Sequence, residues 1–239
     1  QAFGDERSLA LAEESFCRVY YGSEKVGDDG SYADPKRGLG GGMFWEWQPI
    51  DKPKPHKPGD FRSACINFPT VIAACLLSRM VPESQTVADT ETHPKAQSRA
   101  FYLRTAREVY KWADETLVEN GRVADGIHNA GPEFNDHLYN QATYIGASCL
   151  LYQLTGERDY LRKAVEGANY VFEKMCKDGI LPLETGPEQG VYCAIFAQYM
   201  RMLVYDCGQR QYLTYIRQNI EAGWKNRDRK NGLSDGRFA

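Results

Sequence analysis

A weak internal repeat is the feature that most constrains the fold of this chain. A polar or aromatic residue, a leucine, and a small or β-branched residue three positions later recur four times, at Leu9, Leu103, Leu161 and Leu213. The last three leucines are spaced by 58 and 52 residues, and the first two by 94. Such a repeat indicates units of supersecondary structure that stack on one another.

Each leucine begins a helical pattern of apolar residues. After Leu161 a wide apolar stripe with the period of an amphipathic helix continues to Met175. Helical runs richer in small and apolar residues precede the last three leucines, at 64–80, 140–154 and 191–206. Short turns join the two kinds of helix, and Gly156 is placed as a helix terminator. The repeating unit is therefore an inner-type helix, a turn and an outer-type helix.

The remaining segments are irregular. Strand-like alternation is nearly absent, so the sequence predicts an all-α array of helical hairpins. The segments 48–60, with four prolines, and 81–99, which is polar, are predicted to be surface loops. Glycine-bearing loops at 38–47 and 121–138 are where function is expected on a helical scaffold. The first unit has only its outer-type helix, because the chain opens at the position of the inter-helix turn.

Charge and hydropathy exclude several partners. There are 29 Lys and Arg against 32 Asp and Glu, a net charge of −3 with the signs interspersed. This pattern argues against nucleic acid or an anionic membrane as a partner. No apolar run approaches the roughly 18 to 20 residues of a membrane-spanning segment. Aromatic residues form 12% of the chain, which favours either an aromatic core or a site that stacks on sugar rings.

Cysteine and histidine spacing gives no sign of a metal or a cofactor. The seven cysteines show no C-x-x-C pair, and the four histidines form no metal-binding motif. We therefore expect neither a metal site nor a cofactor. Cys17, Cys75 and Cys149 fall within apolar-periodic stretches and are expected to be buried, inert thiols.

The first glycine-bearing loop combines three glycines with large aromatic residues and a carboxylate, in the order Gly-Gly-Gly-Met-Phe-Trp-Glu-Trp over residues 40–47. Glycines allow close backbone approach, and aromatic faces beside acids are how proteins bind a pyranose ring. Phe44 and Trp45 are therefore candidates to line a sugar site. The alternative is a loop that inserts its aromatic residues into the helical core.

Two more candidate groups lie around the second loop. Asp125, followed by Gly126, could bind substrate or simply cap a turn. Tyr139, Asn140 and Gln141 place an aromatic ring and two amides at the start of an inner helix, where a cleft is expected. Asn140 could instead be the N-cap of that helix.

These motifs, in this order, resemble glycoside hydrolase family 76 over nearly the whole chain. The motifs are 40–45, Asn67 in an inner helix, 125–127, 139–141 with Gly146 and Ala147, 194–199 and 223–227. The family consists of endo-acting α-1,6-mannanases with an (α/α)6 barrel. The resemblance implies that Phe44, Trp45, Asn67, Asp125, Tyr139, Asn140 and Gln141 bind substrate.

The resemblance also implies a retaining hydrolysis of α-1,6-mannosidic linkages by two adjacent aspartates at the start of an inner helix. Retention requires two carboxyl groups about 5 to 5.5 Å apart. The pair Asp28 and Asp29 lies in a loop after the first helix, so the catalytic roles are not transferred to it. The family's pair is expected upstream of residue 1, and no catalytic residue is assigned within the chain.

The barrel expected from the resemblance is incomplete in this chain. Seven helices are expected where the barrel has twelve, and relatives continue with another hairpin after the stretch that resembles Gly232 and Leu233. Residues 1–239 are thus expected to form one (α/α)6-type catalytic domain without its N-terminal helices and last hairpin. Cys193 and Ala194 stand where relatives have Lys and Gly.

The expected partner is an α-mannan oligosaccharide or polysaccharide, bound by a monomer. The expected location is extracytoplasmic, meaning periplasmic, surface-bound or secreted, with the signal region not in this sequence. One alternative is a noncatalytic glycan-binding relative. Another is a different (α/α)6 sugar enzyme, a sugar epimerase or an unsaturated glucuronyl hydrolase, for which His128 and His137 would be the catalytic candidates.

Overall fold

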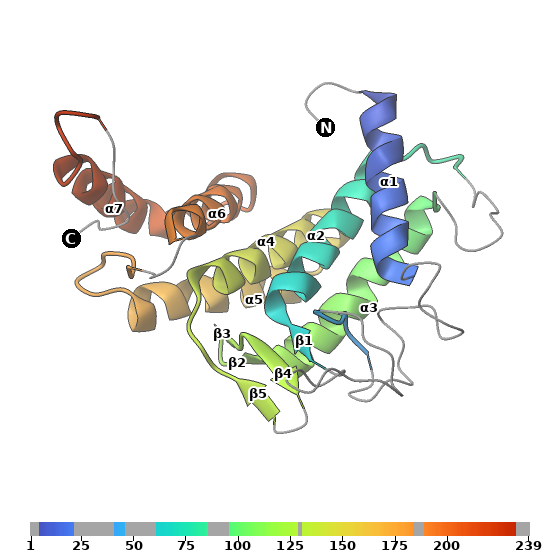
Figure 1. Ribbon diagram of the computed structural model, residues 1–239, viewed down its shortest axis with the longest axis horizontal. Coiled ribbons are helices and arrows are strands. Elements are labelled where there is room, and N and C mark those ends of the chain that lie inside the picture. Colours follow the sequence, from blue (N-terminus) through green and yellow to red (C-terminus); the bar gives the residue numbers. More distant parts are fainter. Residues whose placement is uncertain are drawn as a thin grey trace. The chain divides into compact units, whose positions relative to one another are not determined.

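The computed structural model describes residues 5–21, 41–45, 61–85, 96–128, 131–183 and 189–232. The chain forms two compact units, drawn in Figure 1, and each is described by itself. Unit 1 comprises Gln1–Leu117 and Ala124–Glu133, and unit 2 comprises Val118–Val123 and Phe134–Ala239. The Asp28–Asp29 pair, Gly40 and the segment 48–60 lie outside the described residues.

Unit 1 contains three helices, α1 (Glu6–Tyr21), α2 (Ala64–Met80) and α3 (Arg99–Leu117), among its described residues. The inner-type helix α2 packs against both others (Figure 1). Ten of its residues are buried, because its sequence is apolar on every side. The outer-type helices α1 and α3 bury one face each, as amphipathic sequences do. All three predicted helices of this unit are confirmed.

A buried polar network joins α1 to the rest of unit 1. The Glu13 carboxylate is only 4% exposed and accepts hydrogen bonds from the Tyr102 hydroxyl (2.9 Å) and Gln85 Nε2 (2.6 Å). The Tyr102 ring also meets the Phe16 ring edge to face, with centroids 5.3 Å apart. A buried carboxylate is costly unless its oxygens are paired, so these bonds fix the position of α1 on α3.

Two small antiparallel sheets interrupt the helices. Sheet A joins β1 (Arg62–Ser63), β4 (Gly126–His128) and β5 (Gly131–Glu133) in the order β1-β4-β5, within unit 1. A two-stranded sheet in unit 2 joins β2 (Val118–Glu119) and β3 (Arg122–Val123). The sequence indicated loops here, because strands of two or three residues are too short to show an alternating pattern.

Unit 2 contains two consecutive hairpins of helices. The first joins α4 (Leu138–Thr155) to α5 (Arg158–Tyr170), which continues as the π-helix η1 (Val171–Met175). The second joins α6 (Gln189–Arg201) and its π-helical extension η2 (Met202–Asp206) to the short η3 (Arg210–Tyr212) and α7 (Leu213–Lys225). The described residues thus confirm the predicted all-α class and the alternation of inner-type and outer-type helices.

The helix termini of unit 2 follow local chemistry. Gly156 ends α4 with a φ of +73°, and its N–H bonds the Tyr152 carbonyl at 2.8 Å. A residue without a Cβ adopts this left-handed conformation without strain, so the predicted terminator is confirmed. At the other end of α4, His137 occupies the N-cap position and Asn140 is the third helical residue. The N-cap alternative for Asn140 is therefore wrong.

All seven cysteines are free thiols, and the predicted burial of Cys17, Cys75 and Cys149 is confirmed. Burial raises the pKa of Cys17 to about 11 and that of Cys75 to about 12. A hydrogen bond with Cys207, together with burial, raises the pKa of Cys149 as well. Thiols with raised pKa hold little thiolate at neutral pH and are poor nucleophiles.

Hydropathy adds one finding on membranes. Within the described ranges, no helix combines the length and the apolar character needed to cross a lipid bilayer.

Candidate functional site

The glycine-bearing loop of unit 1 lies directly against an indole ring. A Cβ on Gly41 would lie 2.9 Å from Trp112 Cδ1, and one on Gly42 would overlap the same ring. Gly42 also has a φ of +78°, which residues with a side chain rarely adopt. The glycine run therefore allows the loop backbone to approach α3 closely, as the sequence indicated.

Asn67 holds this loop from α2. Its Oδ1 accepts from the Met43 N–H (2.7 Å), and its Nδ2 donates to the Met43 carbonyl (3.0 Å) and to the Ser63 carbonyl (2.8 Å). The side chain is fully buried. One amide thus satisfies three backbone groups and ties the loop to the first turns of α2. Its geometry is that of a loop anchor.

The two aromatic candidates of this loop have different environments. Phe44 is 2% exposed and lies under the buried guanidinium of Arg62, whose Cζ is 4.3 Å from the ring centroid. A cation over an aromatic face is an attractive contact inside a protein. Trp45 is 43% exposed, and its backbone N–H donates a hydrogen bond to the Phe61 carbonyl at 3.1 Å. Of this pair, Trp45 is the residue that can reach a ligand.

Asp125 is half-buried and lies where sheet A meets α2. Its N–H donates to the Glu133 carbonyl (2.8 Å), and its own carbonyl accepts from the Ala64 N–H (2.9 Å) at the start of α2. Burial raises the pKa of the Cys65 thiol, and the nearby charge of Asp125 adds a smaller effect in the same direction. The backbone of Asp125 therefore joins the sheet to the helix, and its carboxylate lies close to Cys65.

The other three candidates belong to unit 2 and lie in the first turn of α4. Tyr139 is half-buried between two rings, those of His137 (centroids 5.3 Å apart) and Tyr192 (4.6 Å). Asn140 and Gln141 are fully buried. The Gln141 amide, oriented to match its partners, donates to the Gly121 carbonyl and accepts from the Val123 N–H, both at 3.0 Å. Gln141 therefore fixes the turn between β2 and β3 on α4.

The predicted residues thus form two groups, each at the N-terminal end of an inner-type helix. Phe44, Trp45, Asn67 and Asp125 surround the start of α2 in unit 1, and Tyr139, Asn140 and Gln141 lie in the first turn of α4 in unit 2. Sequence reasoning overlooked Phe61, whose ring meets Trp45 edge to face with centroids 6.1 Å apart. The sequence pattern did not mark Phe61, because the two residues of β1 that follow it are too few to show a strand pattern.

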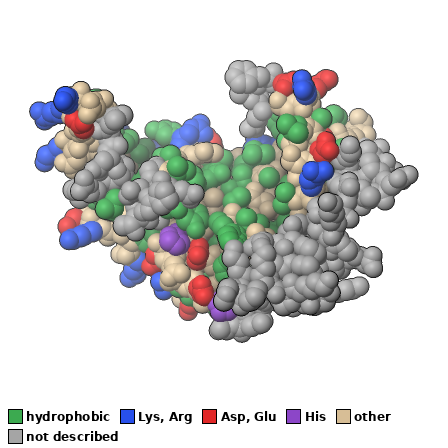
Figure 2. All heavy atoms as spheres, viewed as in Figure 1, with side chains coloured by type: hydrophobic (Ala, Val, Ile, Leu, Met, Phe, Trp, Pro, Cys, Tyr) green, Lys and Arg blue, Asp and Glu red, His purple; other side chains and the backbone are tan. Residues whose placement is uncertain are grey.

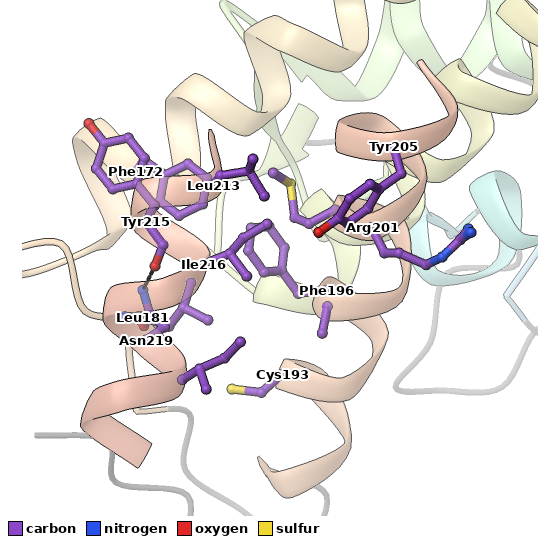
Figure 3. Close-up of a pocket in the computed structure, with 13 residues that line it drawn as sticks. Phe172, Leu181, Cys193, Phe196, Arg201, Tyr205, Leu213, Tyr215, Ile216 and Asn219 are labelled. Carbon is purple, nitrogen blue, oxygen red and sulfur yellow. Dashed lines mark hydrogen bonds between the residues drawn. The ribbon is translucent and has the colours of Figure 1, made fainter. Parts of the chain in front are cut away.

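A separate apolar pocket of about 220 Å³ lies in unit 2 between η1, α6 and α7 (Figure 3). Apart from Arg201 and Asn219, the residues named in Figure 3 are apolar, aromatic or sulfur-containing. The Asn219 amide is already satisfied by the protein. Its Oδ1 accepts from the Leu181 N–H (2.8 Å), and its Nδ2 donates to the carbonyls of Gly179 (2.8 Å) and Tyr215 (2.9 Å). A sugar needs many hydrogen-bonding partners, so this pocket does not suit one.

Comparison with known proteins agrees with this arrangement of helices and loops. The profile described as Glycosyl hydrolase family 76 matches residues 32–237. The chain belongs to glycosyl hydrolase family 76. The resemblance to this family that the sequence motifs indicated is thereby confirmed.

Solved structures share the fold of this family member. A protein from Listeria innocua is 24% identical with a TM-score of 0.68, and the match covers 84% of this chain and 52% of that one. Another match is the α-1,6-mannanase of Salegentibacter sp. HEL1_6, solved as a variant inactivated at two neighbouring aspartates and bound to α-1,6-mannotriose. It is 25% identical with a TM-score of 0.66, and the match covers 87% of this chain and 59% of that one.

A family 76 mannosidase from Bacteroides thetaiotaomicron is 20% identical with a TM-score of 0.59, and the match covers 82% of this chain and 51% of that one. The chain therefore spans between half and three fifths of the length of these three relatives. No curated protein sequence matches it.

Proposed function

We propose that this family 76 chain is part of a retaining glycoside hydrolase that cleaves α-1,6-mannosidic linkages in mannan. The observation that carries the proposal is the family match over residues 32–237. The α-1,6-mannanase from Salegentibacter supports the choice of linkage, because its inactive variant binds α-1,6-mannotriose. That variant is altered at two neighbouring aspartates, which agrees with a paired-carboxylate mechanism.

The two catalytic carboxylates are proposed to come from an aspartate pair upstream of residue 1. In a retaining mechanism one carboxylate attacks the anomeric carbon and forms a covalent glycosyl-enzyme, while the other, as an acid, protonates the leaving oxygen. The second group then acts as a base and activates the water that releases the sugar. The proposed substrate-binding residues of each unit would bind mannosyl units of the substrate.

Exposure and hydrogen bonding divide the seven proposed substrate-binding residues by role. We assign direct contact with sugar to Trp45, Asp125 and Tyr139, whose side chains are partly accessible. Phe44, Asn67, Asn140 and Gln141 are buried and are proposed to contribute by positioning loops and helix starts. A stacking indole and a carboxylate acceptor together recognise the apolar face and the hydroxyls of a pyranose.

We also propose that residues 1–239 belong to one (α/α)6-type catalytic domain, which acts extracytoplasmically as a monomer. The repeat of inner-type and outer-type helices in both units supports a single architecture, since each described inner-type helix is followed by an outer-type partner.

The decisive experiment is hydrolysis of α-1,6-mannan by the chain expressed together with its upstream reading frame. Release of reducing ends, with the α-anomer formed first in a proton NMR time course, is expected for a retaining α-mannanase. Trp45→Ala should lower kcat/KM about tenfold through lost stacking, and Trp45→Phe should retain most of it.

Trp224→Ala is the matched control, because Trp224 is a 67% exposed indole on α7 and is not among the seven proposed substrate-binding residues. Binding of mannan without hydrolysis would support the noncatalytic alternative. If the chain neither binds nor hydrolyses mannan, the proposed substrate is refuted.

A further inference from the structure

Sheet A in unit 1 has one face with a composition suited to a flat ligand. In antiparallel pairs, opposed residues share a face and successive residues alternate. The register pairs Arg62 with Ile127, and both are buried. Gly126 with Glu133, and His128 with Gly131, are therefore on the opposite face. We call this second set, together with Phe61, the sheet face.

The two glycines of the sheet face differ in what lies over them. A Cβ on Gly126 would lie 2.6 Å from Phe61 Cζ, so the phenyl ring occupies the space that a side chain would fill. A Cβ on Gly131 would meet nothing within 4 Å. The Phe61 and His128 rings lie 6.5 Å apart at 37°, and the Trp45 ring meets the Phe61 ring edge to face. Phe61 therefore contacts both of the other rings.

A carboxylate completes the face. His128 Nε2 and Glu133 Oε1 are 2.6 Å apart, and the Glu133 side chain is 49% exposed. A carboxylate accepts about four hydrogen bonds, so one bond to His128 leaves Glu133 able to accept from ligand hydroxyls. The imidazole holds the carboxylate in one orientation, which lowers the entropy cost of binding.

We infer that the sheet face is a subsite for a neutral hexopyranose unit, with Phe61 against the ring's apolar face, Trp45 beside it and Glu133 accepting from its hydroxyls. The inference rests on the proposed function, to which it adds Phe61, His128 and Glu133 as specificity-determining residues. A uronic acid is disfavoured, because the Glu133 carboxylate on this face would repel the carboxylate of the ligand.

The test is titration calorimetry with α-1,6-mannotetraose as the probe. Phe61→Leu removes the aromatic face and should weaken binding about fivefold to tenfold, whereas Phe61→Tyr keeps a ring and should bind like the parent. Glu133→Gln keeps the side-chain shape but removes the charge, and should weaken binding by about fivefold. His128→Asn should have a smaller effect of the same sign.

Glu115→Gln is the matched control, because Glu115 is an exposed residue of α3 that pairs with Lys111. Thermal unfolding of every variant separates lost binding from lost folding. Equal binding by the parent, Phe61→Leu and Glu133→Gln, all folded, would overturn the inference.

A second probe set keeps the two proposals distinct. If the parent chain does not bind α-1,6-mannotetraose, the proposed substrate fails, and the sheet face is then titrated with maltotetraose, cellotetraose and tetragalacturonate. Binding of a neutral tetrasaccharide that is weakened by Phe61→Leu would still support a neutral hexose subsite. Binding of tetragalacturonate in preference, or of none of these probes, would overturn it.

Discussion

The inner-type helices α4 and α6 of unit 2 are both rich in small and apolar residues, but their surroundings differ. Thirteen of the 18 residues of α4 are buried. In α6, Phe196 and Met200 are buried, while Val191 is 55% exposed. Figure 2 shows hydrophobic side chains at the surface where α6 lies.

The difference arises from neighbours rather than from composition. Helix α4 packs against α5, α6 and β3, whereas one side of α6 borders the apolar pocket of Figure 3. An apolar helix can be buried on all sides, but only packed elements remove its surface from water. Within this unit, the two helices therefore offer matched positions at which burial alone differs.

The largest expected effect comes from matched isoleucines. Ile145 of α4 is fully buried, and Ile195 of α6 is partly buried at the edge of the same core. Ile145→Ala should lower the free energy of unfolding by about 3 kcal/mol, because it removes packed methyl groups and leaves a cavity. Ile195→Ala should cost about 1 kcal/mol, because solvent already reaches that side chain.

Urea denaturation of the two isoleucine variants measures both values. Equal losses would mean that α6 is as closely packed in solution as α4, and the comparison would then be wrong.

The contact between the two helices is tested by glycine variants. A Cβ on Gly146 would overlap the Tyr199 ring of α6, whereas one on Gly156 would meet nothing within 4 Å. Gly146→Ala should cost about 2 kcal/mol through overpacking, despite the better helix propensity of alanine. Gly156→Ala should cost about 1 kcal/mol through backbone strain at its positive φ. Thermal unfolding ranks the two, and a stabilising Gly146→Ala would contradict the close approach.

The smallest expected effect is at the exposed part of α6. Val191→Ser should change the free energy of unfolding by no more than about 0.5 kcal/mol, because the side chain is mostly in water. The buried reference is Val171 in η1, where the same substitution places a hydroxyl in the core and should cost more than 1 kcal/mol. A large loss at Val191 would indicate that this surface is covered in solution.

The positions of the helices could be predicted from the sequence, but the roles of single site residues could not. Helix α2 begins and ends where the apolar run predicts, because helix periodicity is a local property. The amides of Asn67 and Gln141 resembled sugar-binding groups, yet each bonds backbone atoms of another segment. Their partners are distant in the sequence, so no local pattern indicates them.

The sequence by itself determined the helical hairpins, the glycine terminator at Gly156 and the family, because periodicity, backbone conformational freedom and ordered motifs are written along the chain. Only the tertiary structure decided that Trp45 is exposed while Phe44 lies under Arg62, and that Phe61, His128 and Glu133 share one face of a sheet. The physical reason is that burial and strand register depend on contacts between distant segments, which form together when the chain folds.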